Sequence, residues 1–82
     1  MSKNSGFANR DRFIDLGIII AFASKLRGMS QEQLAEKAGI SRSHLSAIEA
    51  PNLVRAFSVD ILFSIADALN LKASDLLENR IR

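Results

Sequence analysis

The sequence predicts an all-α fold of five helices, and two observations support this prediction. Apolar residues recur at three- and four-residue spacing instead of alternating with polar ones, which is typical of helices that bury one face. Four glycines and a single proline, Pro51, divide the chain into segments of helical length. Because 82 residues can enclose only one core, we expect a single domain at residues 11–82 behind a flexible tail at residues 1–10.

The first two predicted helices have clear ends. The first runs from about Asp11 to Arg27, with acidic residues near its start and basic residues in its last turn, as the helix dipole favours. The second begins at Ser30, which together with Gln33 fits a capping box. Glycines at positions 28 and 39 are placed to end the two helices.

Three further helices follow along the chain. The third is predicted over residues 41–49, the fourth over residues 58–70 and the fifth over residues 73–79. Ser41 and Ser58 are the expected N-caps of the third and fourth helices. The fourth helix places its leucine and isoleucine residues on one face. We expect this face to pack with the third and fifth helices in one small core.

The composition limits the function classes. The chain has no cysteine and one histidine, His44, so it can build neither a disulfide framework nor a cysteine/histidine zinc site, and we expect no metal or cofactor. No glycine-rich phosphate loop and no nucleophile with an evident histidine–carboxylate pair is present, which argues against an enzyme. The most apolar window, residues 16–23, is too short to cross a bilayer, so we expect a cytoplasmic protein with no membrane partner. The net charge of +2 allows a nucleic-acid partner without requiring one.

The predicted third helix carries the candidate functional site. Only a three-residue turn separates it from the second helix, an arrangement that can hold a DNA-reading helix in the major groove but also occurs in plain helix packing. At 100° per residue, Leu45 and Ile48 point inward. An arginine can bind a guanine edge, serines can donate or accept, and a small apolar residue can touch a thymine methyl group. This mix lies on the outward face, which carries Arg42, Ser43, Ser46 and Ala47.

Residues 28–49, GMSQEQLAEKAGISRSHLSAIE, closely resemble the helix-turn-helix of the Cro/CI family, also called XRE-type regulators. Residues 63–71, FSIADALNL, and residues 75–77, DLL, resemble that family's fourth and fifth helices. The resemblance spans roughly residues 13–78 and implies a five-helix, lambda-repressor-like DNA-binding domain. It also implies a sequence-specific transcriptional regulator, a repressor, that binds a palindromic double-stranded operator as a homodimer.

The resemblance assigns roles to individual residues. Arg42, Ser43, Ser46 and Ala47 match the family's base-reading positions. Gln31 at the amino end of the second helix is expected to bind a DNA phosphate, where backbone amides also favour an anion. Further contacts to the phosphate backbone are expected from Ser30, His44, Asn52 and Arg55.

Two positions depart from the family pattern. Many relatives have an arginine near Ser24 that pairs with the glutamate at Glu49, and serine cannot supply that charge. We therefore expect Glu49 to be solvated or to pair with Arg27 or Arg55, with a more loosely braced third helix. The loop after Glu49 is also longer and more apolar than usual, which makes Val54 and Phe57 candidate packing or dimer contacts.

The first helix is more apolar than one core-facing stripe requires. Its apolar residues span about half of its circumference, whereas a stripe of about 100° suffices to face a core. Two explanations stay open: the amino-terminal segment with Phe7 folds back over the surplus, or the surplus binds a second subunit or another protein. The candidate contacts are Ile14, Ile18 and Phe22. The second explanation allows an alternative function as a protein-interaction module, such as an antitoxin whose first helix binds its partner.

Overall fold

The computed structural model describes residues 9–50 and 56–79, and these residues form five α-helices. The helices are α1 (Arg10–Leu26), α2 (Gln31–Ala38), α3 (Arg42–Glu49), α4 (Val59–Ala68) and α5 (Ala73–Leu77). The predicted all-α class and the order of the elements are confirmed. The helix α1 begins one residue before the predicted Asp11, and both α4 and α5 end two residues earlier than predicted.

Serine side chains start the three middle helices, as predicted. The hydroxyl of Ser30 accepts a hydrogen bond from the backbone amide of Gln33, and the Gln33 side chain accepts one from the Ser30 amide, which completes the capping box. Ser41 and Ser58 each accept a hydrogen bond from the amide three residues ahead. The beginning of each of these helices is therefore determined by local sequence.

Two helices end at the predicted glycines. Gly28 and Gly39 adopt positive φ angles of 70° and 74°, a conformation that places the following amide near an orphan carbonyl of the last turn. The Met29 amide accordingly donates to the Ser24 carbonyl, and the Ile40 amide donates to the Ala35 carbonyl. These tight ends set the directions in which α2 and α3 leave the preceding helices.

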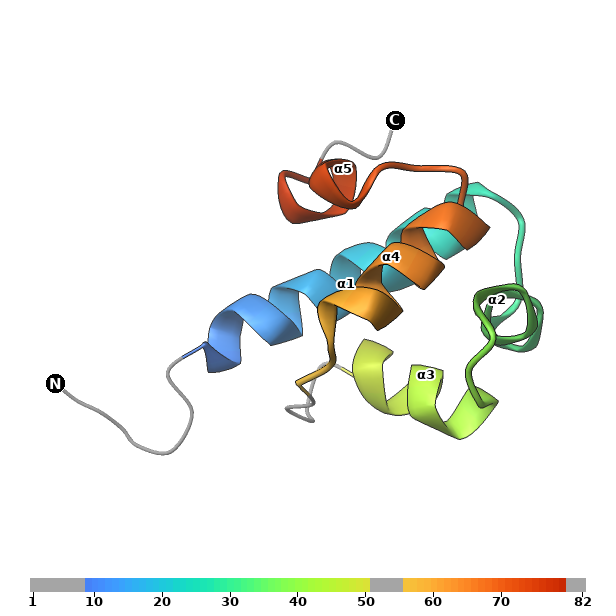
Figure 1. The fold of residues 1–82 in the computed structure, drawn as a ribbon, viewed down its shortest axis with the longest axis horizontal. Coiled ribbons are helices and arrows are strands. Elements are labelled where there is room, and N and C mark those ends of the chain that lie inside the picture. The colour runs from blue at the N-terminus through green and yellow to red at the C-terminus, as the bar shows by residue number, and fades with distance from the viewer. Residues whose placement is uncertain (1–8, 51–55, 80–82) are drawn as a thin grey trace, which may run out of the picture.

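The helices enclose one core. Figure 1 shows α1 running along the length of the molecule and the shorter α4 across its middle, with α2 at the right, α3 below and α5 above. The helix α1 packs on α3 and α5, and α2 packs on α3 and α4. Six side chains that are fully buried come from all five helices: Ile20, Leu34, Leu45, Ile65, Leu69 and Leu76. None of the helices in the two described ranges is both long and apolar enough to span a bilayer.

Candidate nucleic-acid interface

The turn between α2 and α3 holds the third helix at the surface. Leu45 and Ile48 are buried in the core, as their spacing predicted, so the opposite side of α3 faces outward. Arg42, Ser43 and Ser46 are exposed on that side, while Ala47 and His44 are half-buried at its flanks. Within residues 9–50 and 56–79 the Arg42 guanidinium forms no ion pair, which leaves it available to an external acceptor.

The amino end of α2 borders this face. Gln31 is the first residue of α2, and its side-chain amide nitrogen donates a 2.9 Å hydrogen bond to a carboxylate oxygen of Glu49 at the end of α3. An amide group has two N–H donors, so one remains for an anion such as a DNA phosphate. Ser30, which precedes it, is exposed. The predicted phosphate-binding residues Asn52 and Arg55 lie outside the described residues.

The surroundings of Glu49 differ from the predicted solvation and from the predicted pair with Arg27. Its carboxyl group is neither fully solvated nor paired with Arg27, because Gln31 bonds one oxygen and the other is buried without a hydrogen-bond partner among the described residues. Arg27 instead donates from Nε to the Leu69 carbonyl at 2.9 Å, which ties the end of α1 to the end of α4. Arg55, the other predicted partner, lies outside the described residues.

Burial raises the pKa of Glu49 above its ordinary value of 4.5. Two smaller effects lower it: the hydrogen bond from Gln31 and the positive charge of Lys25 on α1. The carboxyl group is therefore a partly desolvated acid beside the predicted phosphate site, with an uncharged side chain in place of the arginine that the family pattern provides.

Ser24 has a structural role that the sequence did not reveal. It is buried, and its hydroxyl donates a 3.0 Å hydrogen bond to the Met29 carbonyl in the turn between α1 and α2. The looser bracing of α3 stays a prediction. The helix α3 does contact α1 at a second place. The backbone of α1 at Gly17 lies so close to the Ile48 carbonyl that an added Cβ atom would overlap it.

Gly17 is the residue at this site that sequence reasoning passed over. A glycine inside an otherwise good helical pattern costs stability relative to alanine, so its presence is a signal of close backbone approach. The contact fixes the carboxyl end of α3 against α1, while the amino end of α3, with Arg42 and Ser43, projects outward.

The predicted contacts on the apolar surplus have two different environments. Ile18 and Phe22 on α1 are exposed, with 47% and 44% of their surface accessible, whereas Ile14 is half-buried. Phe57 is also half-buried, and its ring meets that of Phe13 edge to face at 5.3 Å between centroids. Part of the surplus is therefore covered within the chain, and part is open. The predicted contact Val54 and the residue Phe7 lie outside the described residues.

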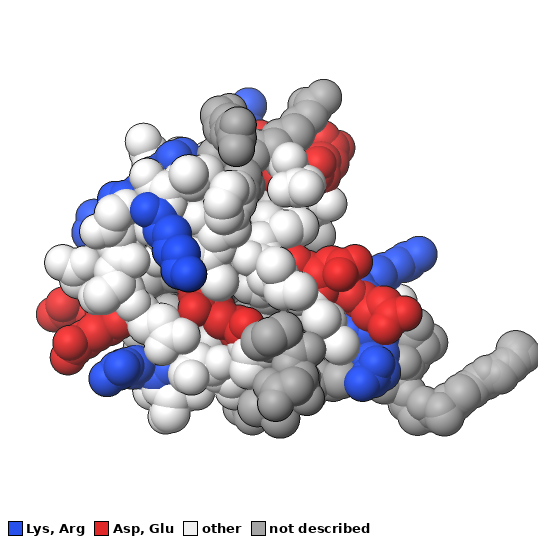
Figure 2. Space-filling model, turned by 180° about the vertical axis from the view of Figure 1, so that it is seen from behind, with Lys and Arg blue, Asp and Glu red and all other residues white. Residues whose placement is uncertain are grey.

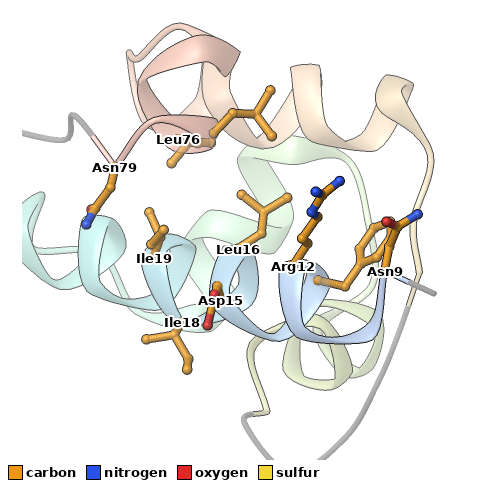
Figure 3. A pocket seen from close by; sticks show the side chains of 10 residues that line it. Asn9, Arg12, Asp15, Leu16, Ile18, Ile19, Leu76 and Asn79 are labelled. Carbon is orange, nitrogen blue, oxygen red and sulfur yellow. The ribbon is translucent and has the colours of Figure 1, made fainter. Parts of the chain in front are cut away.

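A groove lies between α1 and α5, away from this interface. It is lined mainly by apolar side chains such as Leu16, Ile19 and Leu76. Figure 3 shows these three side chains pointing into the space between the helices, with Arg12 and Asn79 at its edges. The lining also includes the charged side chains of Arg12 and Asp15.

Comparisons with known proteins agree with this geometry. The family model described as Helix-turn-helix matches residues 23–76, which contain α2 to α4 and most of α5. Among solved structures, the restriction-modification controller protein C.AhdI from Aeromonas hydrophila is similar, with a TM-score of 0.74 and 26% sequence identity over 80% of this chain and 97% of the other. A search of curated proteins gave no match. The family and this structural relative are DNA-binding regulators, and the chain belongs to the Cro/CI-type, or XRE, family of helix-turn-helix transcriptional regulators.

Proposed function

We propose that this protein is a sequence-specific repressor that binds a palindromic double-stranded DNA operator as a homodimer. The observation that supports the proposal is the exposed face of α3, where Arg42, Ser43 and Ser46 project from a helix held at the surface. Each recognition helix would enter one of two successive major grooves, about 34 Å apart. The similarity to a restriction-modification controller protein supports a regulatory role.

Each side chain on this face has a distinct role in the proposal. Arg42 would bind the O6 and N7 atoms of a guanine in bidentate fashion, and its freedom from internal ion pairs among the described residues supports this. Ser43 and Ser46 would exchange hydrogen bonds with neighbouring base edges, and the methyl group of Ala47 would contact a thymine. Gln31 would donate its remaining N–H to a phosphate and so set the register of α3 in the groove.

Selection of bound sequences from random duplex DNA tests the function. The wild-type protein should enrich a palindrome, and Arg42→Ala should relax the preference at one base pair in each half-site. Arg12→Ala serves as the matched control, because it removes an exposed arginine from α1 instead of α3. The control should enrich the same palindrome as the wild type. If the wild type enriches no sequence, the proposed function is wrong.

A second candidate function is a protein-interaction module, such as an antitoxin whose first helix covers a partner protein. The exposure of Ile18 and Phe22 on successive turns of α1 favours it, because contiguous exposed apolar surface marks interaction sites, whereas scattered exposed apolar residues do not. This function needs no operator, so the selection experiment separates the two candidates.

A further inference from the structure

The hydrogen bond between Gln31 and Glu49 connects the proposed phosphate site to an acid. The Gln31 amide nitrogen lies 2.9 Å from a carboxylate oxygen of Glu49, and its second N–H is the one proposed to meet a DNA phosphate. Two acceptors bound to the two N–H groups of one amide lie about 5 Å apart, because the N–H directions diverge by about 120°. The carboxyl group and the phosphate would therefore be held on either side of a single nitrogen atom.

This arrangement brings two negative charges together when Glu49 is ionised. At a separation of about 5 Å, the repulsion between two unit charges weakens binding about 4-fold in water and more in a partly buried site. The second carboxylate oxygen of Glu49 is buried and has no hydrogen-bond partner among the described residues. Water therefore screens this carboxylate less than it screens one at the surface.

The neighbouring helices do not neutralise the carboxylate with an ion pair in the part of the chain that the structure describes. On α1, the hydroxyl of Ser24 is bound to a backbone carbonyl, and so is the Arg27 side chain. Lys25 on α1 lowers the pKa of Glu49 through its charge but forms no ion pair with it. The group that α2 contributes is the uncharged amide of Gln31.

We propose that Glu49 acts on operator binding through Gln31, and that its carboxyl group takes up a proton from solvent when a phosphate binds to the Gln31 amide. Protonation removes the repulsion, and the hydrogen bond can persist because the carbonyl oxygen of a carboxylic acid still accepts from the amide. Glu49 is thus a positioning residue, since it orients the amide that contacts DNA. The inference rests on the proposed function, because it concerns the same operator complex.

The charge of the surrounding surface leaves this effect measurable. The net charge of the whole chain is only +2. Figure 2 shows acidic side chains lying between basic ones on the face opposite to the view of Figure 1, without a continuous basic surface. Because the attraction between basic groups and phosphates supplies much of the affinity for DNA, one carboxylate beside a phosphate should reduce that affinity.

The direction of the pH dependence follows from the order of two pKa values. Burial raises the pKa of Glu49 above 4.5 in the free protein, and a neighbouring phosphate would raise it further in the complex. Below both pKa values the carboxyl group is protonated with and without DNA, and above both it is ionised in each state. Between them binding takes up a proton, so operator affinity should fall as the pH rises through this range.

Operator affinity as a function of pH tests the proposal, with the palindrome enriched in the selection experiment as the probe. Fluorescence anisotropy at constant salt concentration measures the affinity between about pH 5 and about pH 8. Over this range the wild type should lose about 4- to 10-fold more affinity than Glu49→Gln, which keeps the acceptor oxygen but cannot ionise. At the upper end of the range Glu49→Gln should bind more tightly than the wild type.

Two controls separate Glu49 from other sources of pH dependence. Glu36→Gln removes the same charge from an exposed position on α2 and should follow the wild type. His44 lies on α3, and histidine is the side chain that ordinarily changes charge in this pH range. The difference that Glu49→Gln causes should therefore persist in a chain that also carries His44→Gln.

Gln31→Ala tests the route between the two groups and keeps the proposal testable if Glu49→Gln fails to fold. The change removes the amide that holds the phosphate beside the carboxyl group. Gln31→Ala should bind the operator more weakly than the wild type and with a smaller pH dependence. An undiminished pH dependence would show that Gln31 does not connect the two groups, and the proposal would be overturned.

The outcomes distinguish this inference from the proposed function. If the wild type binds its palindrome with the same pH dependence as Glu49→Gln, proton uptake at Glu49 is overturned and the proposed function stands. If the wild type enriches no sequence in the selection experiment, the proposed function is overturned and this inference falls with it.

Discussion

The partly buried carboxyl group of Glu49 makes the stability of the domain depend on pH. Because burial raises its pKa above 4.5 in the folded state, the folded protein binds a proton more readily than the unfolded chain does. The stabilisation from this proton is present at pH below about 4.5 and is lost as pH rises through the raised pKa. Above that pH the folded protein holds a carboxylate that lacks a cationic hydrogen-bond partner among the described residues.

Glu49→Gln should remove this dependence. The amide oxygen can still accept the hydrogen bond from Gln31, so the fold should persist while the titrating group is gone. The free energy of unfolding of the variant, relative to the wild type, should increase between pH 4.5 and pH 7, by less than about 1 kcal/mol because the site is partly solvated.

Urea unfolding at a series of pH values measures this difference. Glu36→Gln is the control, since it removes the same charge from an exposed position on α2. A wild-type minus Glu49→Gln difference that stays constant across this pH range, as expected for an ordinary exposed carboxyl, would contradict the assigned environment of Glu49.

Residue roles were predictable from sequence where they depend on near neighbours. Inward Leu45 and Ile48 and the cap at Ser41 follow from spacing within one helix, and the structure confirms them. The bonds from Gln31 to Glu49 and from Arg27 to Leu69 join residues 18 and 42 positions apart. Helical periodicity contains no information about such pairs, which is why Arg27 was a predicted partner of Glu49 and Gln31 was not.

At the scale of elements, the contact between α1 and α3 orients the recognition helix. Gly17 is the only position at which the two backbones are shown to exclude a Cβ atom, among the glycines in the described ranges. The sequence predicted both helices, but it did not predict their distance, because closeness of two backbones depends on the crossing point and not on the pattern of either helix. The bounds of the helices were predicted to within two residues.

Gly17→Ala tests this contact through the sign of its effect. Helix propensity alone predicts a gain of about 1 kcal/mol in the free energy of unfolding. Overlap with the Ile48 carbonyl predicts a loss of about 1–3 kcal/mol instead, together with displacement of α3 and weaker operator binding. Thermal unfolding and a DNA titration measure the two effects. A stabilised variant with unchanged operator affinity would contradict the close packing of α1 on α3.

At the scale of the whole molecule, the fold and the family followed from sequence because caps, spacing and motif order all indicate the same arrangement. The family match then covered α2 to α4 and most of α5, as the motif had predicted. The exposed surface of α1 lies largely outside those motifs, so its extent became visible only once the core contacts of Ile20 and Leu16 were known.

The central claim is that α3 reads base edges through Arg42, and a double-mutant cycle between protein and DNA tests it most directly. The affinity of the wild type and of Arg42→Ala is measured for the selected operator and for the same operator with 7-deazaguanine at the base pair whose preference Arg42→Ala relaxes. Deazaguanine lacks the N7 acceptor that a bidentate arginine requires.

The wild type should lose about 5- to 100-fold in affinity on deazaguanine, corresponding to about 1–3 kcal/mol. Arg42→Ala, which lacks the side chain that contacts N7, should bind the two operators with nearly equal affinity. This difference is the coupling energy between the side chain and the base. Equal losses for both proteins would show that Arg42 does not contact that guanine, and the proposed reading of DNA by α3 would be contradicted.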